Sequence, residues 1–124
     1  MKATISAVKK QFPDRKLIAC IELHTFSSLN KEFLQQYKNS MGEADHAIVY
    51  IDYHTFEQKK LTPFNQNDVQ TAFGDNKLLF FDDISILKSH LNSFNFVDSN
   101  LLLMSSGTFS NTDLQKLARE LNMK

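Results

Sequence analysis

The chain contains four short runs of almost uninterrupted apolar residues, and a helical pattern separates each run from the next. The runs are residues 16–23, 46–51, 77–81 and 100–104. A strand with one face in water alternates apolar and polar residues, whereas a strand buried on both faces is apolar throughout. Buried strands joined by helices form a parallel sheet between two helical layers. The sequence therefore predicts an α/β fold, a three-layer αβα sandwich around a mainly parallel sheet of at least four strands.

Helical spacing of apolar residues predicts the elements between and beside these strands. The expected helices are residues 2–12, 29–41, 67–73, 84–94 and 114–121. Gly42 and Gly74 are expected to end the second and third helices, because glycine readily adopts the left-handed conformation found there. Ser110 and Asp113 have the spacing of a capping box for the last helix. Residues 52–65 are predicted to be a polar connection.

Right-handed crossovers make 3-2-1-4 the economical order of the strands, which gives a Rossmann-like sheet. The first and fourth strands are then neighbours whose connections leave toward opposite faces. Ligands of open α/β sheets bind at such a switch point, beyond the carboxyl ends of the strands. The turns at 24–28 and 105–109 therefore predict a polar crevice between them.

Composition narrows the class of protein. The 124 residues suit one domain. Lys+Arg and Asp+Glu number 14 each, which disfavours a nucleic-acid partner, because such partners require a basic surplus. No apolar run is long enough to span a membrane and no secretory signal is recognisable, so a cytoplasmic location is expected. A helix that begins almost at Met1, with no strand before it, suggests that the chain was cut from a larger protein.

The sequence can be searched for a phosphate loop, a metal or catalytic thiol site, and a nucleophilic serine. With 3 glycines, at positions 42, 74 and 107, the chain cannot form a glycine-rich phosphate loop. Its four histidines have no metal-ligand spacing, and the single Cys20 lies in an apolar run, so neither a metal site nor a catalytic thiol is expected. Ser105 and Ser106 lack the flanking glycines of a nucleophile elbow. Their hydroxyls, with free backbone N–H groups, are better suited to hold a carboxylate or amide of a bound peptide. His24, at the end of a central strand, is a candidate ligand contact.

Three stretches of the chain resemble one protein family. They are KATISAVKKQFPDRKLIACIELHTFSS, EADHAIVYIDYHTFEQKKL and the LLLMSSGTF turn. Together they resemble the C-terminal domain of the Mur ligases over residues 2–121. The likeness is greatest to the branch containing UDP-N-acetylmuramate:tripeptide ligase and UDP-N-acetylmuramate–alanine ligase. In this branch the MSSGTF turn and Glu22 fit the tripeptide ligase.

The resemblance implies that residues 1–124 are the single C-terminal domain of a three-domain ligase and are inactive alone. ATP, Mg²⁺ and UDP-N-acetylmuramate would be held by the missing N-terminal and central domains. The family activates the muramyl carboxylate as an acyl phosphate, and an incoming amine displaces phosphate through a tetrahedral intermediate. The C-terminal domain contributes the site for that amine substrate and closes over the reaction, as lids commonly do.

The resemblance also assigns site residues. His24 matches a histidine of the alanine-adding branch, and the loop after the last strand matches the family's substrate loop. The expected substrate-binding residues are His24, Thr25, Ser28, Ser105, Ser106, Gly107, Thr108 and Phe109. Thr25 and Ser28 replace arginines of the alanine-adding branch, which removes a carboxylate clamp and favours a tripeptide or another peptide as substrate. Phe109 is expected either to line this pocket or to pack beneath the turn.

The alternative is a stand-alone binding or regulatory module with a flavodoxin-like sheet and no catalysis. In that case Asp52 or Asp82, at the ends of strands, would be the working residue. A ligase domain should be preceded in its gene by a long reading frame with a glycine-rich phosphate loop, whereas a module should not. An independent enzyme ranks last, because no base–nucleophile pair can be identified.

Overall fold

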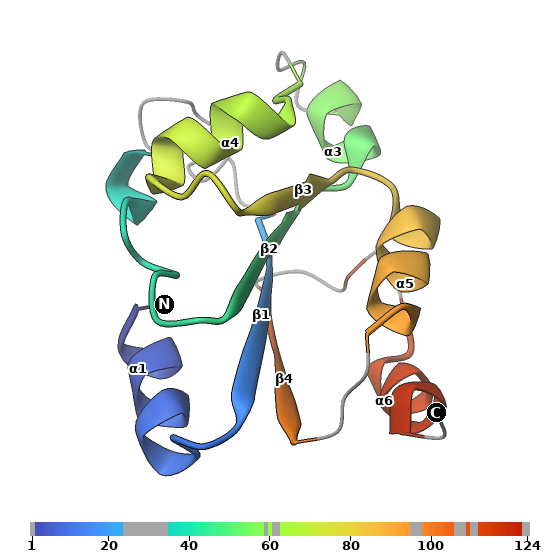
Figure 1. The fold of residues 1–124 in the computed structure, drawn as a ribbon. Helices are drawn as coiled ribbons and strands as arrows, with labels where there is room; N and C mark the ends of the chain where they lie inside the picture. The colour runs from blue at the N-terminus through green and yellow to red at the C-terminus, as the bar shows by residue number, and fades with distance from the viewer. Residues whose placement is uncertain are drawn as a thin grey trace.

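The computed structural model describes residues 2–23, 35–58, 60, 63–94, 98–105, 109 and 112–122. Four parallel strands form one sheet in the order β3-β2-β1-β4 (Figure 1). Their bounds are β1 Lys16–Glu22, β2 His46–Tyr50, β3 Leu79–Phe81 and β4 Ser99–Ser105. The predicted α/β sandwich and its strand order are confirmed.

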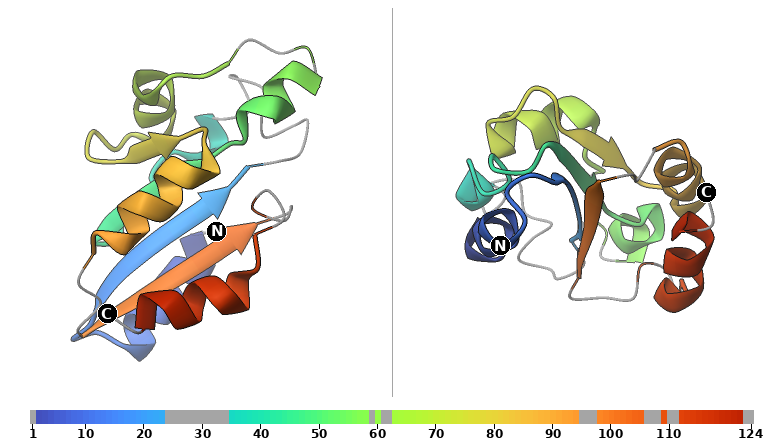
Figure 2. Two further views of the ribbon diagram at one scale, coloured as in Figure 1. Left: turned by 90° about the vertical axis from the view of Figure 1, so that its right-hand side faces the viewer. Right: turned by 60° about the horizontal axis from the view of Figure 1, so that its bottom comes forward.

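Helices cover both faces of this sheet. One face carries α1 (Lys2–Gln11), the 3₁₀ helix η2 (Gln35–Tyr37) and α4 (Gln66–Phe73), and the other carries α5 (Ile84–Asn92) and α6 (Leu114–Asn122). In the left view of Figure 2, α5 and α6 lie in front of β1 and β4 while α1 lies behind them. None of the helices among the described residues combines the length and apolar character that crossing a bilayer requires.

The alternation of side chains along β1 and β2 divides the core into two parts. Leu17, Ala19 and Leu23 point to the α1 and α4 face, where Ile5 and Phe73 complete the packing. Ile18, Cys20, Ile48 and Tyr50 point to the other face, against Leu87, Leu91, Leu117 and Leu121. Helices cover both faces of the sheet, so neither side of the central strands faces solvent. The central strands are therefore apolar at almost every position.

The prediction of a helix through Met41 with Gly42 as its cap is wrong for the described part of that segment. Only Gln35–Tyr37 is helical, as one 3₁₀ turn. Asn39 then adopts the left-handed conformation, with φ of 64°, and its N–H donates to the Phe73 carbonyl over 2.9 Å. This turn ends the helix early and directs Met41, 1% exposed, into the core.

The predicted polar connection 52–65 contains a helix that the sequence analysis missed, α3 (Tyr53–Gln58). The Asp52 carboxylate caps it by accepting the His54 N–H over 3.0 Å. Phe56 is 1% exposed and meets Phe64 edge to face, with ring centroids 5.2 Å apart. The sequence analysis missed this helix because six residues are too few to show apolar residues recurring at helical spacing.

The other helix ends follow local sequence signals. Asn65 and Asp68 form a capping box at the start of α4, and Gly74 ends it with φ of 67°, as predicted. Asp83 caps α5 through the N–H groups of its first turn. At α6 the Asp113 carboxylate accepts the Lys116 N–H over 3.1 Å, so Asp113 is itself the N-cap. The predicted capping box, with Asp113 three residues inside the helix, is therefore wrong, and Ser110 lies outside the described residues.

Gly74→Ala should destabilise the domain by about 1–2 kcal/mol, because an alanine must pay the cost of the left-handed backbone. The new Cβ would also lie 3.3 Å from the Asn39 side-chain oxygen. Gly42→Ala is the matched control: its Cβ would meet only the Asn39 carbonyl oxygen, at 3.7 Å, and a change within about 0.5 kcal/mol is expected. Urea unfolding of both variants measures the difference, and equal losses would contradict the assigned cap.

Asp45→Asn should lower stability near neutral pH and have little effect in acid. The Asp45 carboxylate accepts the Lys9 ammonium and the Leu17 N–H, each over 2.7 Å, and these bonds hold its pKa below the ordinary value. A lowered pKa contributes stability above the unfolded-state pKa, and that stability is lost as pH falls through the folded-state value. Since Asp45 is 39% exposed, screening limits the effect to about 1 kcal/mol. Thermal unfolding of both proteins between acid and neutral pH tests it, and a pH-independent difference would be the contrary result.

Candidate functional site

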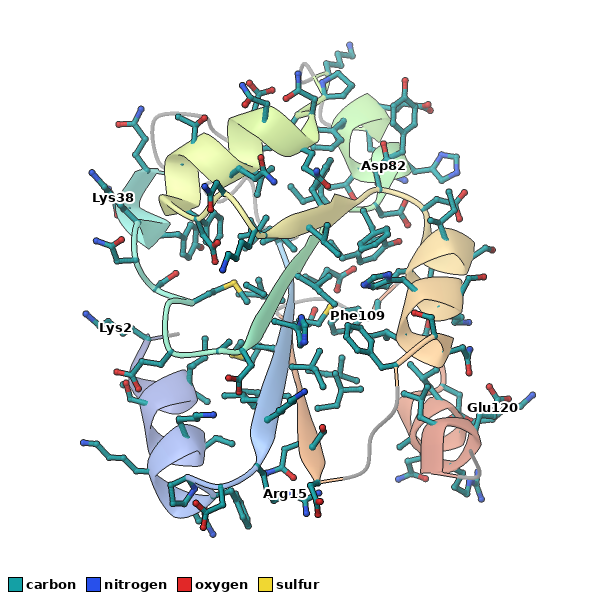
Figure 3. All side chains as sticks on the ribbon, viewed as in Figure 1. Lys2, Arg15, Lys38, Asp82, Phe109 and Glu120 are labelled. Atoms are coloured by element: carbon teal, nitrogen blue, oxygen red, sulfur yellow. The ribbon has the colours of Figure 1, made fainter. Side chains whose placement is uncertain are left out.

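The carboxyl ends of β1 and β4 bring together residues that are far apart in the chain. Glu22, the last residue of β1, pairs in register with Ser105, the last residue of β4. Phe109 follows four positions later and is buried on the α5 and α6 side of the sheet (Figure 3). These three residues form the described part of the switch point between β1 and β4.

One oxygen of the Glu22 carboxylate accepts hydrogen bonds from Ser105, the last residue of β4, and from Phe109. The Phe109 N–H donates to Oε1 over 2.9 Å, and the Ser105 hydroxyl donates to the same atom. The Glu22 residue is 3% exposed, and its bond from Phe109 is buried, whereas its bond from Ser105 is partly buried. Hydrogen bonds to an ionised acceptor in such surroundings are about twice as strong as neutral ones. The carboxylate therefore links Ser105 and Phe109 to the end of β1.

Phe109 has an uncommon backbone conformation for a residue with a side chain. Its φ is 49°, in the left-handed region, where a non-glycine residue is strained by about 1–3 kcal/mol. The ring stacks on Tyr50 of β2 with centroids 6.1 Å apart and an angle of 9° between the planes. Its carbonyl accepts the Thr112 N–H over 3.2 Å, just before α6. Contacts on three sides hold this strained residue in place.

Two of the predicted site residues are thus brought together. Ser105 and Phe109 share the Glu22 oxygen, and Phe109, 3% exposed, packs in the core on the α5 and α6 side of the sheet. The others lie outside the described residues and stay predictions: His24, Thr25, Ser28, Ser106, Gly107 and Thr108.

Glu22 is the site residue that the sequence analysis did not select. Its signals were its fit to one branch of the family that the sequence resembles and a charge near the end of an otherwise apolar strand, on the same face as Ile18 and Cys20. An ionised side chain in such a position must be hydrogen-bonded if it is buried. Its partner Phe109 stands 87 residues further along the chain, so no local pattern could reveal the contact.

The remaining titratable candidates do not join this site. His46 and His90 both contact Phe94, and His46 begins β2 at the opposite end of the sheet. His54 lies beside Glu57, with 3.7 Å between Nδ1 and Oε2. Within the described ranges no three His, Cys, Asp or Glu side chains are grouped closely enough to hold a metal ion.

A cavity of about 500 Å³ lies at the carboxyl ends of β2 and β3. Tyr50 lines this cavity, and its ring also stacks on the ring of Phe109. The cavity therefore adjoins the residues that bind Glu22. Asp52, His54 and Asp82 give it a polar wall. Two other cavities, of about 550 and 590 Å³, lie along β4 and near the amino end of β2.

Two solved structures share this fold over almost the whole chain, although no family model matches it. One is a domain assigned to a UDP-N-acetylmuramate:L-alanyl-γ-D-glutamyl-diaminopimelate ligase from Haemophilus ducreyi. The match has 21% identity, a TM-score of 0.62, and covers 97% of this chain and 80% of that one. The other is a murein peptide ligase from Psychrobacter arcticus, with 20% identity, a TM-score of 0.69 and coverage of 97% and 24%.

Both neighbours are Mur-type ligases, so the resemblance seen in the sequence is confirmed at the level of the fold. The present chain spans about a quarter of the length of the murein peptide ligase. It therefore corresponds in extent to one domain of that enzyme.

The Cys20 thiol should be inert toward thiol reagents in the folded protein. Burial, with a smaller contribution from the Glu22 charge, raises its pKa to about 12, so the reactive thiolate is scarce at pH 8. Ellman's reagent should therefore react at least about a hundredfold more slowly with the native protein than with the urea-unfolded one. Equal rates in both states would contradict the burial of Cys20 beneath α5 and α6.

Proposed function

We propose that the chain is the C-terminal domain of an ATP-dependent peptidoglycan-precursor ligase, which joins a peptide or amino acid to UDP-N-acetylmuramate through an acyl phosphate. The domain would provide the site for the amine substrate and close over the reaction. The observation that carries the proposal is the pair of hydrogen bonds from Ser105 and Phe109 to Glu22, at the switch point of a fold shared with two Mur-type ligases.

In the proposal, this domain and the other two domains of the ligase bind different substrates. Its 3 glycines cannot form a phosphate loop, so ATP and Mg²⁺ belong in the proposal to the N-terminal and central domains. What the chain offers at the switch point is a carboxylate, a hydroxyl and the end of a buried strand. A buried negative charge favours an approaching amine over an approaching carboxylate. The site is thus suited to the nucleophilic end of the substrate.

The second candidate is a stand-alone binding module that uses the cavity at Asp52 and Asp82. That cavity, of about 500 Å³, lies at the carboxyl ends of β2 and β3, where ligands of parallel sheets commonly bind. Asp82 follows β3 directly and Asp52 lies two residues after the end of β2, so a module of this kind would place its ligand near β2 rather than near β1.

Activity of the parent polypeptide tests the ligase proposal. It would be assayed for phosphate release with ATP, UDP-N-acetylmuramate and either L-alanine or the tripeptide L-alanyl-γ-D-glutamyl-meso-diaminopimelate. Release with the tripeptide supports the proposal and the preference drawn from Thr25 and Ser28. Release with alanine alone would keep the ligase and overturn the substrate preference, and release with neither from a folded protein would contradict the ligase.

The isolated chain should bind the tripeptide weakly, in about the millimolar range, because the other domains are missing. His24→Ala should weaken that binding about fivefold, the effect of losing one hydrogen bond. His46→Ala is the matched control, because His46 begins β2 at the far end of the sheet. Nitrogen–proton NMR titrations measure both, and shifts gathered around Asp52 and Asp82 instead would favour the binding module.

A further inference from the structure

A row of four aromatic rings links the end of α5 to the sheet, and two of the four are histidines. His90, in the last turn of α5, lies beside Phe81 and Phe94, with ring centroids 5.1 and 5.0 Å away. Phe94 in turn meets His46, the first residue of β2, edge to face at 5.1 Å. We propose that this aromatic row is an acid-sensitive joint, at which protonation of His90 loosens the end of α5 from the sheet. The inference goes beyond the proposed function and does not rest on it.

The first argument is that one nitrogen of His90 is poorly placed to carry a proton. Its Nε2 atom is buried and has no hydrogen-bond partner among the described residues. A neutral imidazole tolerates this arrangement, because its one proton can lie on Nδ1. In the charged form both nitrogens are donors, so the N–H at Nε2 would be buried without an acceptor. The cost of that unsatisfied donor opposes protonation in the folded state.

The second argument is the electrostatic effect of the surroundings. Burial, followed by the charge of His46, holds the pKa of His90 below its ordinary value. The carbonyl end of a helix favours a cation in the last turn. At α5, however, the Ser93 N–H and hydroxyl already bind the His90 carbonyl. Burial and the second histidine therefore act against a charge on His90.

The titratable groups that face the aromatic row supply no counterion. On the face of the sheet that α5 covers, β2 carries Tyr50 besides His46, and β1 carries Cys20 and the hydrogen-bonded Glu22. The other charged groups around the row are Lys88 on α5, Asp45, Asp75 and Lys77 around the cavity beside His46, and the exposed Lys116, Arg119 and Glu120 on α6. Within the described ranges no carboxylate forms an ion pair with His90.

Loosening of α5 would also affect the core beside the candidate site. Leu87 and Leu91 of α5 pack in the same part of the core as Tyr50 and Phe109. The side chains of Leu87, Leu91 and Phe109 line one small cavity, so the helix and the Phe109 ring adjoin. The joint therefore acts on the helix that packs against one of the partners of Glu22.

A lowered histidine pKa makes the folded state less stable in acid. The unfolded chain then binds the proton more readily than the folded chain does. The stability is fully present above the unfolded-state pKa and is lost as pH falls toward the folded-state value. The loss therefore begins near about pH 6.5, the unperturbed value for histidine, and continues below it.

Hydrogen exchange near pH 7.5 and near pH 5 tests the joint, with about these values chosen to bracket the histidine range. The Leu91 amide reports the end of α5. The Val69 amide, in α4 on the opposite face, reports openings that leave His90 in place. On acidification the protection factor of Leu91 should fall about fivefold relative to that of Val69, because opening α5 relieves the unsatisfied donor.

The variants separate the joint from a general effect of acid. In His90→Gln, which cannot take up the proton, the relative loss at Leu91 should be less than about twofold. His54→Gln is the matched control: it removes an exposed histidine outside the row and should behave like the unchanged protein. Equal losses at Leu91 and Val69, or an undiminished loss in His90→Gln, would overturn the proposal.

Proton NMR titration of the His90 ring gives a second measurement. The pKa of His90 in the folded protein should lie below its value in the urea-unfolded chain, and His46→Gln should raise it by removing the neighbouring charge. His46→Gln should also reduce the acid-induced loss of protection at Leu91, which keeps the test valid should His90→Gln fail to fold. A folded-state pKa at or above the unfolded one would contradict the joint.

Discussion

The pairing of β1 with β4 is the contact on which the fold and its candidate site both depend. It joins Lys16–Glu22 to Ser99–Ser105 in an unbroken register, although the two strands are the first and the last of the chain. Pairing over so long a separation carries a large loop-closure entropy, which the burial of apolar side chains on both faces must offset. Once formed, it defines the switch point, because β1 continues toward β2 on one side while β4 leads to α6 on the other.

Much of this architecture could be predicted from the sequence because its cause is local. Runs such as 17–21 are apolar at every position, and a parallel sheet covered on both faces is the arrangement that hides them. Gly74 ends α4 because the left-handed turn favours glycine. The early turn at Asn39 could not be predicted, since it depends on the carbonyl of Phe73, and α3 was hidden because Phe56 is buried by Phe64.

The sequence placed Ser105 at the carboxyl edge of the sheet, beside the end of β1, but did not reveal that Ser105 and Phe109 both bind Glu22. The position of Ser105 follows from topology alone, because the carboxyl ends of parallel strands share an edge. The partnership of Glu22 with Ser105 and Phe109 does not, because it depends on side-chain direction and on a backbone conformation that phenylalanine seldom adopts. Nothing in the local sequence around Phe109 requires a positive φ.

Side-chain hydrogen bonds link β1 and the residue before it to β4 and its neighbours at both ends. At the amino end Arg15 donates to the Ser99 carbonyl over 2.7 Å and to the Asn100 side chain over 2.8 Å, and these bonds are only partly buried. At the carboxyl end the Glu22 carboxylate, 3% exposed, accepts a buried bond from the Phe109 N–H and a partly buried one from Ser105, and burying a carboxylate costs roughly several kcal/mol before its hydrogen bonds compensate. An apolar residue in the place of Glu22 would avoid that cost, and buried charges are frequently replaced in this way without loss of stability. Stability alone therefore does not explain a glutamate at this position.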